Sequence, residues 1–219
     1  MDHIKVIRLS FVNAFLLKAG DSFILIDTGL SMHGETLRNE LAAAGCLPGK
    51  LSLIIITHGD IDHIGNCVML RREYGCRIAM NAGDVPMVRD GITYKRKTRS
   101  MQSRFFSVIR KMLRKKFEFE KFSPDILLAD GDSLTGFGLD AMVIHLPGHT
   151  RGSIGVLTND GSFFSGDTFL NRSKPGPANL IENEESLQNS YKRIRSLPIK
   201  MIYPGHGSPF AIDEIAGKF

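Results

Sequence analysis

The stretch IIITHGDIDHIGN, residues 54–66, decides the architecture of the chain, because an apolar run ends there in a cluster of polar side chains. The segment LSLIIIT, residues 51–57, is rich in isoleucine and is typical of a strand buried on both faces. Four side chains that can bind metal follow within six positions: His58, Asp60, Asp62 and His63. A strand end holds such side chains on a rigid scaffold, so the stretch predicts a metal site at the edge of a sheet.

Three more candidate ligands follow strand-like segments later in the chain. His149 comes after AMVIHLPG, Asp167 after SFFSG and His206 after KMIYPG. Side chains at the ends of neighbouring strands gather at one edge of a sheet, where a scaffold can hold them. Seven such groups can hold two divalent metals, about 3.5–4 Å apart, with one carboxylate bridging them.

The remaining pattern predicts short strands and helices that alternate in both halves of the chain. Strands are expected at 4–10, 14–20, 22–29, 51–57 and 77–81, and again at 141–147, 153–160, 162–168 and 200–207. Helices are expected at 32–45, 63–75 and 182–198. The pattern favours an α/β fold with two sheets and helices outside them, in a single domain that spans 1–219.

Composition narrows the class of protein further. No apolar run is long enough for a transmembrane helix, and the N-terminus lacks the order of a signal peptide. The three cysteines, Cys46, Cys67 and Cys76, form no CxxC pair, which is typical of a reduced, cytoplasmic protein. We therefore expect a cytoplasmic protein, with a homo-oligomer as an open alternative.

The net charge of +5 comes from one segment. Between Lys95 and Lys121, eleven Lys or Arg residues face only Glu118 and Glu120, which leaves +9 there. Apolar residues recur at helical spacing in this stretch, so it predicts a basic helical insert or cap at about 93–122. Three roles stay open: a helix packed on the body, a lid that attracts an anionic or amphipathic substrate, and a helix on a membrane surface. Nucleic acid is not the expected partner, because the charge is local.

Five motifs in order resemble those of the metallo-β-lactamase superfamily. THGDIDHIGN (57–66) is similar to THxHxDHxGN except at Asp60, which makes it an HxDxDH variant of the HxHxDH motif. The other four are ILIDTG (24–29), LPGHTRGSIGV (146–156), FFSGDT (163–168) and YPGHG (203–207). The resemblance implies a four-layer αβ/βα sandwich with two mixed sheets inside, and it implies a small stand-alone hydrolase.

The resemblance also implies a role for each ligand. His58 and His149 would bind the first metal, with Asp60 in place of the usual second histidine. The second metal would take Asp62, His63 and His206, and Asp167 would bridge both metals. Asp62 would in addition orient the attacking hydroxide and move a proton. Asp27 and Thr28 would shape the floor of the site.

Asp60 has two interpretations. As an N-cap, it would accept backbone N–H bonds from the following turn. As a ligand, it adds one negative charge to the site and should raise the pKa of bound water. Carboxylate is also a harder ligand than imidazole and favours Mn or Fe. Two divalent metal ions are therefore expected, Zn first, with Fe or Mn as alternatives.

The reaction implied by the resemblance is hydrolysis, in which a metal-bound hydroxide attacks the carbonyl of an ester, lactone or thioester. The expected partner is a small-molecule substrate. Two alternatives stay open: a phosphodiesterase or nuclease of the same fold, and a non-catalytic metal-binding member. The basic segment favours the first, and Asp60 favours the second.

Overall fold

The computed structural model of the chain describes residues 4–98 and 118–215. The core of the expected basic insert therefore lies outside the described residues. Its described ends, 93–98 and 118–122, contain no helix. Instead, β6 (Lys97–Thr98) pairs with β13 (Leu180–Ile181) in a short antiparallel ladder.

The first sheet has six strands in the order β1-β2-β3-β4-β5-β7. Its members are β1 (Ile4–Leu9), β2 (Val12–Ala19), β3 (Ser22–Ile26), β4 (Leu51–Ile56), β5 (Arg77–Met80) and β7 (Ile126–Leu127). Strands β1 to β3 form an antiparallel meander, and β3, β4, β5 and β7 run parallel. The carboxyl ends of β3, β4 and β5 therefore meet at one edge.

The second sheet has five strands in the order β15-β14-β10-β9-β8. Its members are β8 (Ala141–His145), β9 (Ile154–Thr158), β10 (Ser162–Gly166), β14 (Met201–Pro204) and β15 (Phe210–Ala211). Only β10 and β14 are parallel, and the other pairs are antiparallel. A small ladder of β11 (Phe169–Leu170) and β12 (Gly176–Pro177) follows β10.

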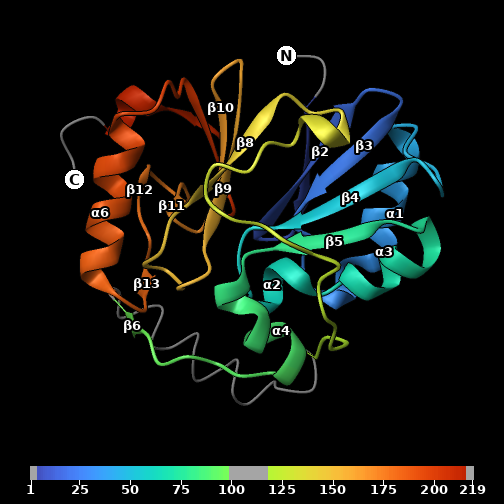
Figure 1. The fold of residues 1–219 in the computed structure, drawn as a ribbon, viewed down its shortest axis with the longest axis horizontal. Coiled ribbons are helices and arrows are strands. Elements are labelled where there is room, and N and C mark those ends of the chain that lie inside the picture. Colours follow the sequence, from blue (N-terminus) through green and yellow to red (C-terminus); the bar gives the residue numbers. More distant parts are fainter. Residues whose placement is uncertain (1–3, 99–117, 216–219) are drawn as a thin grey trace.

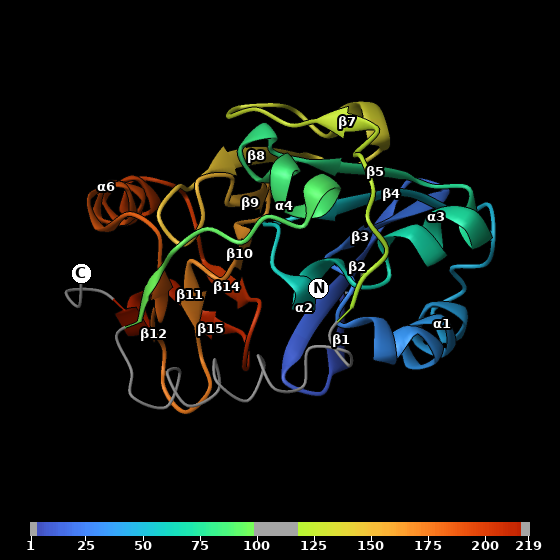
Figure 2. The same ribbon diagram turned by 90° about the horizontal axis from the view of Figure 1, so that it is seen from below.

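Three apolar clusters show that the layers are helix, sheet, sheet, helix. One lies between the first sheet and the helices α1 (Gly34–Ala43) and α3 (Cys67–Tyr74). The middle one lies between the two sheets, and the third lies between the second sheet and α6 (Glu184–Arg195). Figures 1 and 2 show α6 at one end of the molecule and α1 and α3 at the opposite end. The predicted αβ/βα sandwich with two mixed sheets is confirmed.

Strand β4 is buried on both faces, as its continuous apolar run predicts. Ile54 and Ile56 belong to the cluster on the helix side, while Leu53 and Ile55 belong to the cluster between the sheets. All four side chains are fully buried. This strand is the rigid element from which the THGDIDHIGN turn leaves.

The helix expected at 63–75 is instead two helices, α2 (Ile61–Ile64) and α3. The break falls at Gly65 and Asn66. The Asn66 amide nitrogen donates to the carbonyl oxygens of Thr28 (2.6 Å) and Leu30 (2.8 Å), which joins this turn to the loop after β3. These contacts with a distant loop interrupt a helix that local spacing alone would continue.

Short helices complete the described part. They are α4 (Val85–Asp90) and 3-10 turns at Ser31–His33, Ala82–Asp84, Thr135–Phe137 and Ile212–Ile215. Within residues 4–98 and 118–215, no helix combines the length and apolarity that a membrane crossing needs.

Candidate metal centre

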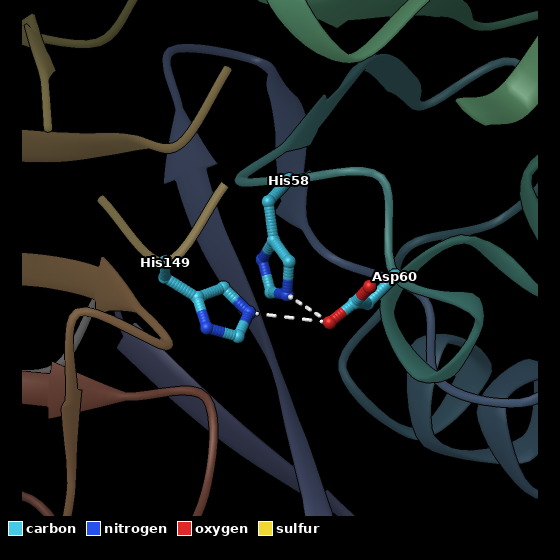
Figure 3. A group of neighbouring side chains, drawn as sticks. All are labelled: His58, Asp60 and His149. Atoms are coloured by element: carbon cyan, nitrogen blue, oxygen red, sulfur yellow. Dashed lines mark hydrogen bonds and ion pairs between the residues drawn. The ribbon is translucent and has the colours of Figure 1, made fainter. Parts of the chain in front are cut away.

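The structure brings all seven predicted ligands together where the two sheets meet. His58 and Asp60 follow β4, and Asp62 and His63 lie in α2. The others follow β8, β10 and β14. Their ligand atoms form three overlapping groups, each within 4.8 Å: His58, Asp60 and His149; His58, His63 and Asp167; and Asp62, His63 and His206. Figure 3 shows His58, Asp60 and His149 pointing toward one another.

Two histidines are oriented by backbone carbonyls. His149 Nδ1 lies 2.7 Å from the carbonyl oxygen of Leu180, and His206 Nδ1 lies 2.6 Å from that of Phe11. A carbonyl oxygen only accepts hydrogen bonds, so each Nδ1 carries the proton and donates it. Each Nε2 then presents a lone pair to the centre, which is the orientation that a metal ligand requires.

Asp27 orients the other two histidines. Its Oδ2 accepts hydrogen bonds from His63 Nδ1 (2.7 Å) and from the Thr57 hydroxyl (2.8 Å), and its Oδ1 accepts from the Thr57 backbone N–H (2.9 Å). Because the Thr57 proton points to Asp27, its oxygen is free to accept from His58 Nδ1 at 3.0 Å. Asp27 is fully buried and has a positive φ of 60°. It thus supports the site from below, as a floor residue would.

Asp62, His63 and His206, together with Asp167, are called the second ligand group below, and this group fits a divalent metal. His206 Nε2 lies 3.2 Å from Asp167 Oδ2 and 3.4 Å from Asp62 Oδ2, and His63 Nε2 lies 3.5 Å from Asp167 Oδ1. Ligands of a tetrahedral ion at about 2.0–2.1 Å lie roughly 3.3 Å from one another, which agrees with these separations. His63 Nε2 and Asp167 Oδ1 are buried and have no hydrogen-bond partner. A cation bound between these two acceptors would satisfy both of them.

Electrostatics point the same way. Burial lowers the pKa of His206, but the carboxylates of Asp167 and Asp62 outweigh it and raise the pKa to about 10. Burial likewise opposes protonation of His63, yet Asp27 and Asp167 raise its pKa well above the usual range. Burial raises the pKa of the Asp167 carboxyl, whereas the two histidines lower it well below its ordinary value. The carboxylates therefore favour positive charge at the imidazoles of His63 and His206, and a bound divalent metal would supply that charge.

The first ligand group has a different environment, because Arg96 lies against it. Arg96 Nη1 donates to Asp60 Oδ2 at 2.6 Å, and Nη2 donates to Asp60 Oδ1. The Asp60 carboxylate makes no capping bond to α2, so the N-cap interpretation is wrong for the side chain, although the residue stands at that position. Burial raises the pKa of Asp60, but the guanidinium holds it well below its usual range.

Sequence reasoning missed Asp84. This fully buried carboxylate accepts hydrogen bonds from the backbone N–H of Gly59 (2.8 Å), the hydroxyl of Thr150 (2.7 Å) and the backbone N–H of Gly152 (2.9 Å). It thereby ties the loop that carries His58 to the loop that carries His149. A signal was present, because Asp84 follows β5, the strand next to β4 in the parallel part of the sheet.

Comparison with known proteins agrees with the geometry. The family model of the Metallo-beta-lactamase superfamily matches residues 7–206. A beta-lactamase-like protein 2 homolog of Drosophila melanogaster is 28% identical over 96% of this chain and 62% of its own length. An atrochrysone carboxyl ACP thioesterase of Aspergillus fumigatus is 25% identical over 92% of this chain and 52% of its own.

A solved metallo-beta-lactamase family protein from Thermus thermophilus has a TM-score of 0.73 at 21% identity, and the match covers 96% of this chain and 75% of that one. This likeness shows the fold. The chain spans about three fifths of the length of the first curated relatives that it matches.

Proposed function

This chain belongs to the metallo-beta-lactamase superfamily, and from that premise we propose that it is a metal-dependent hydrolase of a small ester, lactone or thioester. The superfamily consists mostly of metal-dependent hydrolases. A relative named as a thioesterase, at 25% identity, supports a carbonyl substrate.

One observation carries the proposal. The Nε2 atoms of His63 and His206 and the carboxylates of Asp62 and Asp167 converge with separations of 3.2–3.5 Å. Each imidazole is held from behind by a fixed acceptor. A polar group of this size is costly to bury, so its presence supports a ligand role.

The residues of the centre differ in exposure, and this difference indicates which of them can reach a water molecule. A divalent metal, when bound, would activate a water molecule and polarise a substrate carbonyl. The side chain of Asp62 is 19% exposed, whereas those of His63 and His206 are 0% and 2% exposed. Burial raises the pKa of Asp62, but the neighbouring His206, 3.4 Å away, and the nearby His63 lower it overall. Asp62 is therefore ionised at neutral pH and can accept a proton from water that enters.

One exposed aromatic ring lies beside the centre. The ring of Phe11 is stacked against that of His206, with 5.8 Å between ring centroids and 8° between planes. Phe11 is nevertheless 49% exposed. An exposed aromatic ring next to the ligands gives the acyl chain or ring of a small substrate a surface to pack on.

The phosphodiesterase alternative shares the same metal chemistry and draws on the positive charge of the segment 95–121. The two proposals differ in the substrate that is cleaved. We therefore propose to assay protein reconstituted with Zn, Mn or Fe against parallel panels of esters, lactones, thioesters and phosphodiesters.

The matched variants are His206→Ala and His33→Ala, since His33 belongs to none of the three ligand groups. Loss of a group that merely orients a metal ligand costs about 10–100-fold, so we expect His206→Ala to lower kcat/KM by at least about 100-fold. His33→Ala should keep the activity. Turnover confined to phosphodiesters would support the alternative, and no turnover by fully metal-loaded protein would indicate a non-catalytic member.

A further inference from the structure

Arg96 lies against Asp60 and His149, two of the three ligands of the first group. Its Nη1 lies 2.6 Å from Asp60 Oδ2 and 3.2 Å from His149 Nε2, and its Nη2 donates to the other oxygen of Asp60. The side chains of Arg96 and Asp60 are only 5% and 9% exposed. The contact is therefore a buried, bidentate ion pair rather than a surface one.

Proton positions explain why a cation is needed there. His149 donates its Nδ1 proton to Leu180, so its Nε2 can only accept. Asp60 Oδ2, which also only accepts, lies 3.2 Å from that nitrogen. Arg96 Nη1 has two protons and satisfies both acceptors at once. The guanidinium thus satisfies Asp60 and His149, as a first metal ion would, and it leaves His58 Nε2 without a hydrogen-bond partner.

Charge balance supports the same assignment. Asp60 stands where the HxHxDH motif has a neutral histidine, so this chain carries one additional negative charge in the group. An arginine is always protonated in a protein and restores the balance. For a metal to bind Asp60, Arg96 would have to leave a buried carboxylate, and separating a buried pair is strongly unfavourable.

The backbone on both sides of Arg96 is anchored. Lys97 in β6 pairs with Ile181 in β13, next to Leu180, the residue whose carbonyl orients His149. On the other side, the guanidinium carbon of Arg151 lies 3.8 Å from the centre of the Tyr94 ring. The segment is thereby held against the His149 loop, with Arg96 directed at Asp60.

The second group has no such cation. Among residues 4–98 and 118–215, no lysine or arginine forms an ion pair with Asp62 or Asp167, whose charged neighbours within 4 Å are histidines. The buried ligand atoms without a hydrogen-bond partner are His63 Nε2 and Asp167 Oδ1 of this group and His58 Nε2, which lies within 4.8 Å of them. Arg96 makes no hydrogen bond to any of the three among the described residues.

We propose that Arg96 permanently occupies the first metal position, and that this chain binds a single divalent metal, held by Asp62, His63, Asp167 and His206. One metal would thus replace the two that the sequence predicts. The inference rests on the proposed metal-dependent function.

The test is metal stoichiometry. Protein is saturated with Zn, desalted, and analysed for metal per chain by plasma mass spectrometry. Wild type should retain about one Zn per chain, and the double variant Arg96→Ala/Asp60→His, which removes the cation and restores a neutral ligand, should retain about two. Arg96→Met is a second variant that removes the guanidinium, and it keeps the aliphatic part of the side chain. Arg89→Ala, which removes an exposed arginine paired with Asp90, is the matched control and should stay at about one.

Single-ligand variants locate the ion. His149→Ala should keep the metal of wild type, and His206→Ala should lose it. About two Zn per wild-type chain would overturn the inference while leaving the proposed function intact. No retained metal in wild type after separate saturation with Zn, Mn and Fe would overturn both. Circular dichroism and thermal melting confirm that each variant is folded before its metal content is compared.

Discussion

Asp84 is the residue on which the relative placement of His58 and His149 depends. Its two oxygens accept three hydrogen bonds from two loops, and its side chain is fully shielded from solvent. A carboxylate that accepts several N–H and O–H bonds is strongly stabilised in place. The two loops are therefore joined by a side chain that belongs to none of the ligand groups, in addition to the backbone hydrogen bond from the Ile154 N–H to the Thr57 oxygen (2.8 Å).

We expect Asp84→Asn to destabilise the protein by about 1–3 kcal/mol, because the amide NH₂ would face a donor and leave buried groups unpaired. Urea unfolding of the metal-free protein measures this. The control is Asp21→Asn, since Asp21 is exposed in the turn between β2 and β3. Equal unfolding midpoints for the two variants would show that Asp84 does not tie the loops together.

At the same scale, Asp60 shows where sequence reasoning ends. Its departure from the HxHxDH motif is visible in the sequence, and so is the negative charge that it adds. Its partner is 36 residues away and is one of eleven basic residues in the segment from 95 to 121. Nothing in the local pattern separates Arg96 from the others. Tertiary contacts, the pairing of β6 with β13 and the packing of Arg151 on Tyr94, place it beside His149.

At the scale of elements, a close approach of two backbones separates α2 from α3. A Cβ on Gly65 would meet the backbone nitrogen of Ser31, and it would lie 2.6 Å from the carbonyl carbon of Leu30 and 2.7 Å from the carbonyl oxygen of Gly29. The Gly65 N–H donates to that same oxygen at 2.8 Å. The glycine is therefore required by contact with the loop after β3, and this contact is what the helical spacing of 63–75 could not predict.

We expect Gly65→Ala to cost at least about 1–3 kcal/mol of folding stability, because backbone atoms cannot move aside as flexible side chains can. Gly136→Ala is the matched control, because a Cβ there would have no atom within 4 Å. Thermal or urea unfolding of both variants checks the difference. If Gly65→Ala were as stable as Gly136→Ala, close backbone contact would not explain the break.

At the scale of the whole molecule, the order of the five motifs was enough to predict the layers and to bring seven ligands to one place. An apolar run in the sequence indicates a buried strand such as β4. A candidate ligand after each of several strands indicates that these ligands meet at one edge of the sheets. The number of metals did not follow from this pattern. It depends on which side chains enter the centre from elsewhere, and Arg96 comes from a segment that the motifs do not include.

The ligands of the second group also come from both sheets. Asp62 and His63 follow β4 of the first sheet, whereas Asp167 and His206 follow β10 and β14 of the second. A metal held by all four should bind the folded chain and not the unfolded one, and so should stabilise the contact between the sheets. At a free Zn concentration 100 times the dissociation constant, such binding stabilises the folded chain by about 2.7 kcal/mol.

For a chain of this size, each kcal/mol of added folding stability raises Tm by about 2–4 °C. We therefore expect Tm to rise by roughly 5–10 °C when Zn is added to metal-free protein. EDTA should reverse the rise. His206→Ala should abolish it, because the variant lacks the ligand that approaches both carboxylates, at 3.4 Å from Asp62 and 3.2 Å from Asp167. His33→Ala should show the full shift. If the rise survived in His206→Ala, Zn would be binding elsewhere, and the two sheets would be held together by their apolar interface alone.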